Sequence, residues 1–381
     1  MERVNETDVS FLVCKFCASK KFRYFANQQN EKLASTICAP SKLTSSDEEE
    51  EVSLVANVLH EYGQLQGYFW NNETLAVLCI KHLIKYMPRR DAILLFDESG
   101  MFFDFLFEHL RYSLLSRTSG RLKFTAGIPL DIFLDYVLPY SFINEKRDLF
   151  WRWRPKFYQA LHASVMDMET VTDAMHLVAS TVPQTFMMGF LKVNQTFEIG
   201  DAITWESETS PMNLSPEQVS EHHGSCTGTA ITMAAMARSV GIPIRIVGCS
   251  QSIEGDDHHW TEFYDPLSIG PFRQVEDEKY WHTKEGTSKG NSGGPWDSLS
   301  TPMRMCLEKL IPKDPNKLNT IWVTKYSGAE NLPLQWGNSE TLMKFGRIGS
   351  LNRCGAYCLT WGCGAEQKQY YTQDQCGVSN P

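Results

Sequence analysis

Hydrophobic and polar positions between residues 52 and 192 recur with the spacing of helices. Asn72 and Glu73 mark one helix start, because a capping Asn and a following acid complement the free N–H groups of a first turn. The apolar face predicted for this helix carries Leu75, Leu78, Cys79, His82 and Tyr86. A second run follows Ser99 and places one face at Phe103, Leu106, Leu110 and Leu114. We therefore predict a mainly helical region over 52–192.

The stretch from 224 to 243 has the pattern of a helix with defined ends. Ser225 is a good N-cap residue, so Cys226 falls in the first turn. The helix dipole and the free backbone N–H groups there favour a thiolate over a thiol. Gly241 and Pro243 end the helix, and the apolar run 244–247 predicts a buried strand.

A second strand is predicted at 257–264, which is rich in Trp, Thr, Phe and Tyr. Alternation puts His258, Trp260 and Glu262 on one face of this strand and His259 with Thr261 and Phe263 on the other. Only one of the two imidazoles can then meet Cys226. A thiolate at a helix start that faces a strand histidine is the arrangement that cysteine acyl chemistry needs.

Composition narrows the class of protein. The chain has 381 residues, 42% hydrophobic and 21% charged, which is typical of a soluble globular protein. Its net charge of −9 argues against general binding of nucleic acids or membrane surfaces. No apolar run reaches the length of a membrane span, and the acidic first residues do not resemble a signal peptide. We therefore expect a cytoplasmic protein.

The eleven cysteines are an odd number, so at least one is free, and we expect mainly reduced thiols. Four lie near the C-terminus, at Cys354, Cys358, Cys363 and Cys376. They are weak candidates for zinc or for disulfides, because their spacing fits no paired-CxxC finger. We expect neither a metal nor a cofactor.

The Cys and His motifs together carry a resemblance. Gly-Ser-Cys-Thr-Gly at 224–228, Arg-Ser-Val-Gly-Ile-Pro-Ile-Arg at 238–245 and His-x-Trp-x-Glu at 258–262 resemble the core of the transglutaminase-like superfamily. Segments at 87–91, 133–140 and 145–148 resemble the helical lead-in of one subgroup, and the likeness covers roughly 85–340. The resemblance implies a papain-like fold with a Cys–His–Asp triad.

The likeness selects Cys226 as nucleophile and His258 as base, with His259 as the fallback. The third residue of the triad departs from the family pattern, in which an Asp follows a strand Trp by four residues. Here Glu285 follows Trp281 at that distance, and Asp265, just past the histidine strand, is the competing acid. We favour Glu285. Candidates for the oxyanion hole or for substrate contacts are Gln195, Trp205 and Trp260.

These observations predict an α+β protein. The ranges expected are a poorly ordered arm with an acidic linker (1–51), a helical region packed on the core (52–192), a transglutaminase-like catalytic core (193–345) and a Cys-rich tail (346–381). The acidic run at 47–51 fits a solvated linker or a helix start.

The expected function is cysteine-dependent acyl chemistry on a protein or peptide amide, by a protease, amidase or acyl transferase. The alternative is an inactive binding or scaffold module. The sequence leaves the oligomeric state open.

Overall fold

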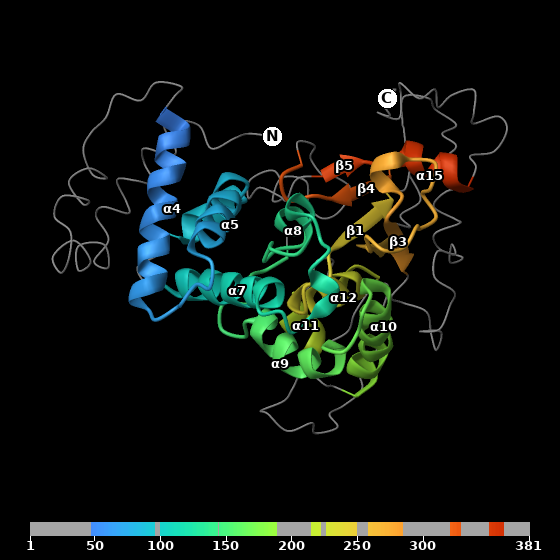
Figure 1. Ribbon diagram of the computed structural model, residues 1–381, viewed down its shortest axis with the longest axis horizontal. Helices are drawn as coiled ribbons and strands as arrows, with labels where there is room; N and C mark the ends of the chain where they lie inside the picture. Colours follow the sequence, from blue (N-terminus) through green and yellow to red (C-terminus); the bar gives the residue numbers. More distant parts are fainter. Residues whose placement is uncertain are drawn as a thin grey trace.

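The computed structural model describes residues 47–95, 100–143, 145–188, 215–221, 226–249, 258–284, 321–328 and 350–361 (Figure 1). Helices precede and surround one antiparallel sheet, so the fold is α+β, as predicted. The helical segments are α4 (Asp47–Leu65), α5 (Glu73–Lys85), α6 (Arg89–Leu94), α7 (Met101–Thr118), η1 (Lys123–Thr125), α8 (Leu130–Tyr136), α9 (Trp153–Val165), α10 (Val171–Met188), α11 (Pro216–Glu221), α12 (Cys226–Ser239), η3 (Glu276–Glu278) and α15 (Cys354–Trp361). The strands are β1 (Ile244–Cys249), β2 (His258–Tyr264), β3 (Trp281–Lys284), β4 (Ile321–Thr324) and β5 (Ser350–Asn352).

Helix α5 shows where the pattern-based prediction was right and where it was wrong. The Asn72 side chain accepts a hydrogen bond from the Leu75 backbone N–H at 2.9 Å, which confirms the predicted cap. The predicted apolar face is wrong in part, because Leu78 is 40% exposed. The buried residues are Ala76, Cys79, Ile80 and Leu83. The spacing of these residues is as regular as that of the predicted face, so periodicity alone does not decide which of the two faces is buried.

Aromatic rings fill the space between α4, α7 and the turn after α4. They include Tyr62, Tyr68, Trp70, Phe103 and Phe107. Their ring centroids lie 5.1–6.3 Å apart, in the range of favourable aromatic pairs. The acidic run at 47–51 begins α4, so the helix start is the alternative that the structure shows.

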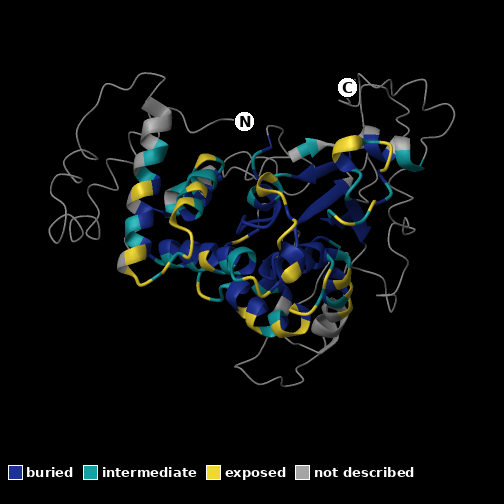
Figure 2. Ribbon diagram, in the orientation of Figure 1, coloured by how far each residue is buried: buried dark blue, intermediate teal, exposed yellow. Residues whose placement is uncertain are grey.

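Helix α12 lies at the centre of the molecule. Every residue from Thr227 to Ser239 is buried, and the helix packs against α9, α10, α11, β1 and β2 (Figures 1 and 2). Small side chains allow this close packing: a Cβ on Gly228 would lie 3.0 Å from Val219 Cγ2 of α11. Gly241 ends the helix with a φ of 84°, which favours glycine.

The strands follow the order β3-β2-β1-β4-β5, and every neighbouring pair is antiparallel. Strand β1 lies in the middle, with Gly248 opposite His259 of β2 on one side and Trp322 of β4 on the other. Strand β5 adds a fifth strand to β4. Helix α15 follows and packs Tyr357 against Trp260 and Phe272. Residues 350–361 therefore contribute one strand to the sheet and one helix that packs on it.

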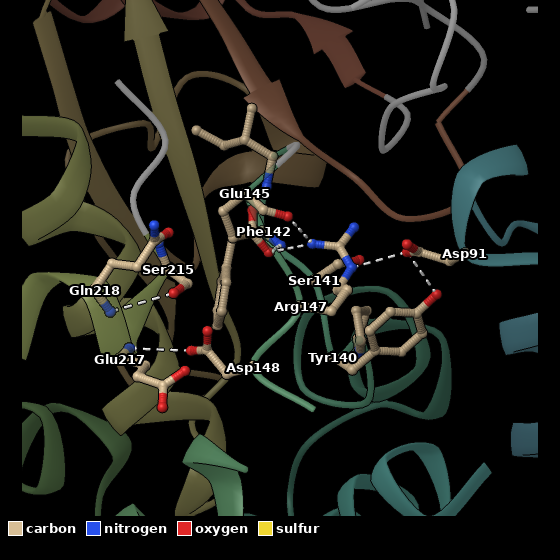
Figure 3. A network of polar contacts seen from close by, with 12 residues as sticks. Asp91, Tyr140, Ser141, Phe142, Glu145, Arg147, Asp148, Ser215, Glu217 and Gln218 are labelled. Carbon is tan, nitrogen blue, oxygen red and sulfur yellow. Dashed lines mark hydrogen bonds and ion pairs between the residues drawn. The ribbon is translucent and has the colours of Figure 1, made fainter. Parts of the chain in front are cut away.

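A buried polar network crosses from α6 to α11 through the segment 139–150 (Figure 3). The Arg147 guanidinium contacts Asp91 at 2.9 Å and Glu145 at 2.6 Å. One residue further, the Asp148 carboxylate accepts the backbone N–H of Glu217, in the first turn of α11, at 3.0 Å. The network therefore connects the early helices to the segment that precedes α12.

Candidate active site

Cys226 is the first residue of α12, as predicted, and is half-buried while the rest of the helix is buried. The first N–H groups of any helix lack intrahelical acceptors and carry the positive end of its dipole. A thiol at this position is therefore near both solvent and a positive electrostatic environment. Residues 222–225, including the proposed cap Ser225, lie outside the described part of the chain.

The two histidines that begin β2 lie on opposite faces of the sheet. His259 faces α12, because its Nδ1 lies 3.0 Å from Thr227 Oγ1. Thr261, two residues on, donates from its hydroxyl to Met233 Sδ of α12 at 3.3 Å. His258 shares the other face with Trp260, and their ring centroids are 5.9 Å apart. His259, which the sequence analysis kept as the fallback, thus contacts the cysteine helix.

The contact between Thr227 and His259 joins the two motifs in space. Cys226 immediately precedes Thr227, and His258 immediately precedes His259. The starts of α12 and β2 are therefore held together although 32 positions separate Cys226 from His258 (258 − 226).

The environments of the two imidazoles differ. Burial, and then the neighbouring His258, lowers the pKa of His259 well below its ordinary value. His259 is therefore neutral at pH 7 and resists protonation. His258 is 8% exposed against 1% for His259, so it is the more accessible of the two.

Asp265, the competing third member, lies just past β2, where its side chain bonds to backbone and hydroxyl groups. Its Oδ2 accepts the Thr172 backbone N–H at 2.9 Å and the Thr172 hydroxyl at 2.6 Å. Its Oδ1 accepts the Leu267 backbone N–H at 3.0 Å. Asp265 thus ties the start of α10 to the turn after β2. Glu285, the favoured third member, lies outside the described residues.

The remaining candidates fall into two groups. Gln195 and Trp205 lie outside the described residues, as do Cys363 and Cys376. Trp260 is buried and donates its indole N–H to the Tyr357 hydroxyl at 2.8 Å, on the sheet face away from α12.

No metal site is found within the described ranges, where no three His, Cys, Asp or Glu side chains gather closely enough to hold an ion. Two of the tail cysteines, at 354 and 358, lie in α15. Among the described helices, none has the length and apolar character required to cross a membrane.

Sequence reasoning missed a buried ionic cluster on the Trp260 face. Arg245 contacts Glu262 at 2.7 Å and also pairs with Glu278, which in turn pairs with Arg353 at 2.6 Å. Tyr357 donates to Glu262 as well. A signal for the first pair was available, because an Arg and a Glu on adjacent predicted strands can pair when the register allows it. The cluster fixes that register, with Arg245 opposite Glu262.

A helix that begins at a cysteine packs here on an antiparallel sheet, and strand β2 of that sheet begins with two histidines. Residues 190–283 match the sequence model of the Transglutaminase-like superfamily, as the motifs in the sequence led us to expect. The match spans α11, α12, β1, β2 and the first part of β3. No curated protein and no solved structure matches the chain.

Proposed function

We propose that the protein performs cysteine-dependent acyl chemistry on amides, with Cys226 as nucleophile and His258 as general base and acid. The observation that carries the proposal is the Thr227–His259 contact, which brings the cysteine and histidine motifs together inside the transglutaminase-like domain. The half-buried Cys226 at the start of α12 supplies a thiol with access to substrate.

The reaction follows from these groups. His258 takes the proton of the Cys226 thiol, and the sulfur attacks the amide carbonyl. The C–N bond breaks while the imidazolium returns the proton to the leaving amine, and a thioester remains on the enzyme. Water then releases an acid, or a primary amine forms a new amide, and the thiol is regenerated. Free N–H groups at the start of α12 stabilise the oxyanion.

His258 suits the role of base better than His259 does. The base must carry a positive charge while the thioester forms. The lowered pKa of His259 opposes that charge, and its Nδ1 is already bonded to Thr227. His258 begins β2 as Cys226 begins α12, so in this proposal the two side chains meet at the starts of these elements rather than across the face that β2 packs on α12. His258 is also more exposed than His259 and fits the His-x-Trp-x-Glu pattern.

Thiol alkylation tests the proposal without a known substrate. Iodoacetamide is added to the full-length protein between pH 5 and 9, and each cysteine is followed by peptide mass mapping. We expect iodoacetamide to alkylate Cys226 at neutral pH much faster than it alkylates an ordinary thiol, because only the thiolate reacts. Cys79 is the slow internal reference, because burial raises its pKa to about 12.

Turnover is then assayed with casein as acyl donor and a fluorescent primary amine as acceptor, together with ammonia and peptide release. Cys226→Ser should abolish turnover, because it removes the nucleophilic thiol. His258→Ala should lower turnover by at least about a hundredfold, the usual contribution of a general base. If His258→Ala keeps activity and His259→Ala loses it, the base is His259. An ordinary alkylation rate at Cys226, together with no turnover, refutes the proposal.

A further inference from the structure

Thr227 and His259 form a buried pair next to the two residues proposed for catalysis. Each is 1% exposed, and Thr227 Oγ1 lies 3.0 Å from His259 Nδ1. Thr227 belongs to the first turn of α12, and His259 is the second residue of β2. The bond thus connects two elements at their starts.

The His259 ring also contacts an aromatic side chain of strand β4. Its edge packs against Trp322 of β4, with ring centroids 5.8 Å apart and planes at 67°. Gly248 of β1 lies between them in register, opposite His259 on one side and Trp322 on the other. Because the ring is held in one position, the Thr227 hydroxyl has a hydrogen-bonding partner at a fixed place.

The protonation state of His259 suits a permanent bond. A neutral imidazole has one donor and one acceptor nitrogen, and a hydroxyl can donate or accept. The bond therefore forms with either tautomer of a neutral ring. Because burial keeps His259 neutral, the bond persists through the pH range in which cysteine enzymes work.

We infer that Thr227 and His259 are positioning residues, whose hydrogen bond fixes the first turn of α12 against the start of β2 and so sets the approach of Cys226 to His258. This inference rests on the proposed function and adds two residues to it. Neither side chain touches substrate. Their effect acts through the separation of thiol and imidazole, to which proton transfer is very sensitive.

The test compares two identical substitutions in α12 of the full-length protein. Thr227→Val removes the hydroxyl and keeps the shape. Thr232→Val is the matched control, because Thr232 is fully buried in the same helix and its hydroxyl has no hydrogen-bond partner among the described residues. The rate of iodoacetamide alkylation at Cys226 is measured as a function of pH for both, with thermal unfolding as a measure of folding.

We expect Thr227→Val to lower the alkylation rate at pH 7 by about tenfold to a hundredfold and to move the reaction to higher pH, while Thr232→Val stays near wild type. Where a substrate is turned over, kcat should fall and KM should hold. Thr227→Ser, which restores the hydroxyl, should recover most of the rate.

A second pair of variants covers the case in which Thr227→Val does not fold. His259→Asn keeps a hydrogen-bonding group near the Nδ1 position, whereas His259→Leu does not, so only the leucine variant should react slowly. The inference is overturned if Cys226 reacts fast and depends on His258 but Thr227→Val and His259→Leu match wild type. If wild-type Cys226 is itself an ordinary thiol, the proposed function fails first and the inference fails with it.

Discussion

Asp148 should make the stability of the fold depend on pH in a direction unusual for a carboxylate. It is 3% exposed and lies between the polar network of the segment 139–150 and the start of α11 (Figure 3). Burial is the largest influence and raises the pKa of Asp148 to about 7, with further increases from Glu217 and Glu145. Hydrogen bonds from Ser215 and from the Glu217 backbone oppose the increase only in part.

The sign follows from comparing folded and unfolded chains. Below about pH 4 both states hold the proton, and Asp148 contributes nothing. As the pH rises from about 4 to 7, the unfolded chain ionises while the folded chain keeps the proton, so stability is lost. A shift of about three pKa units corresponds to about 4 kcal/mol, reached near pH 7 and constant above it.

Asp148→Asn removes the ionisation and keeps an oxygen that can accept the Glu217 N–H. We expect the variant to be more stable than wild type at pH 8, by up to about 4 kcal/mol, and nearly equal to it at pH 4. Urea unfolding followed by circular dichroism at several pH values measures this difference. Asp173→Asn, at an exposed position in α10, is the control. The reasoning is refuted if Asp148→Asn destabilises the protein equally at pH 5 and pH 8.

Four further substitutions test contacts within the fold. Gly270→Ala should destabilise strongly, by more than about 2 kcal/mol, because its Cβ would lie 2.1 Å from the Trp281 carbonyl oxygen. Gly127→Ala, where the nearest atom is 3.5 Å away, should change the melting temperature little. Asp265→Ala should cost about 1–2 kcal/mol as a lost cap, yet leave alkylation of Cys226 unchanged; a slower Cys226 would give Asp265 a role at the site. Arg245→Met should cost about 3–5 kcal/mol in urea unfolding, because it leaves two buried glutamates without this cation, and a neutral result would contradict the ionic cluster.

Local signals predicted the elements of the site well. The start of α12 at Cys226, its end before Gly241 and the strands that follow it were all visible in the sequence, because caps, glycines and β-forming residues act within a few positions. The family pattern placed Trp281 on a strand, and the structure shows that strand, β3, beside β2.

The sequence did not reveal which face of β2 meets α12. All seven residues of this strand are buried, so the pattern contains no polar face to mark the outside. Alternation separated His258 from His259 but could not say which one contacts the cysteine helix. That choice depends on packing between segments distant in the chain, such as Trp322 against His259.

The order of the strands also bears on how the protein is made. Strands β1, β2 and β3 emerge from the ribosome close together, but the partner on the other edge of β1 begins only at Ile321, about 70 residues after Cys249. At about 5–20 residues per second, that edge stays open for several seconds of synthesis. Nascent chains that end before β4 therefore present an unpaired, apolar strand, which invites pairing with other chains. Chaperone binding during translation should concentrate in this interval.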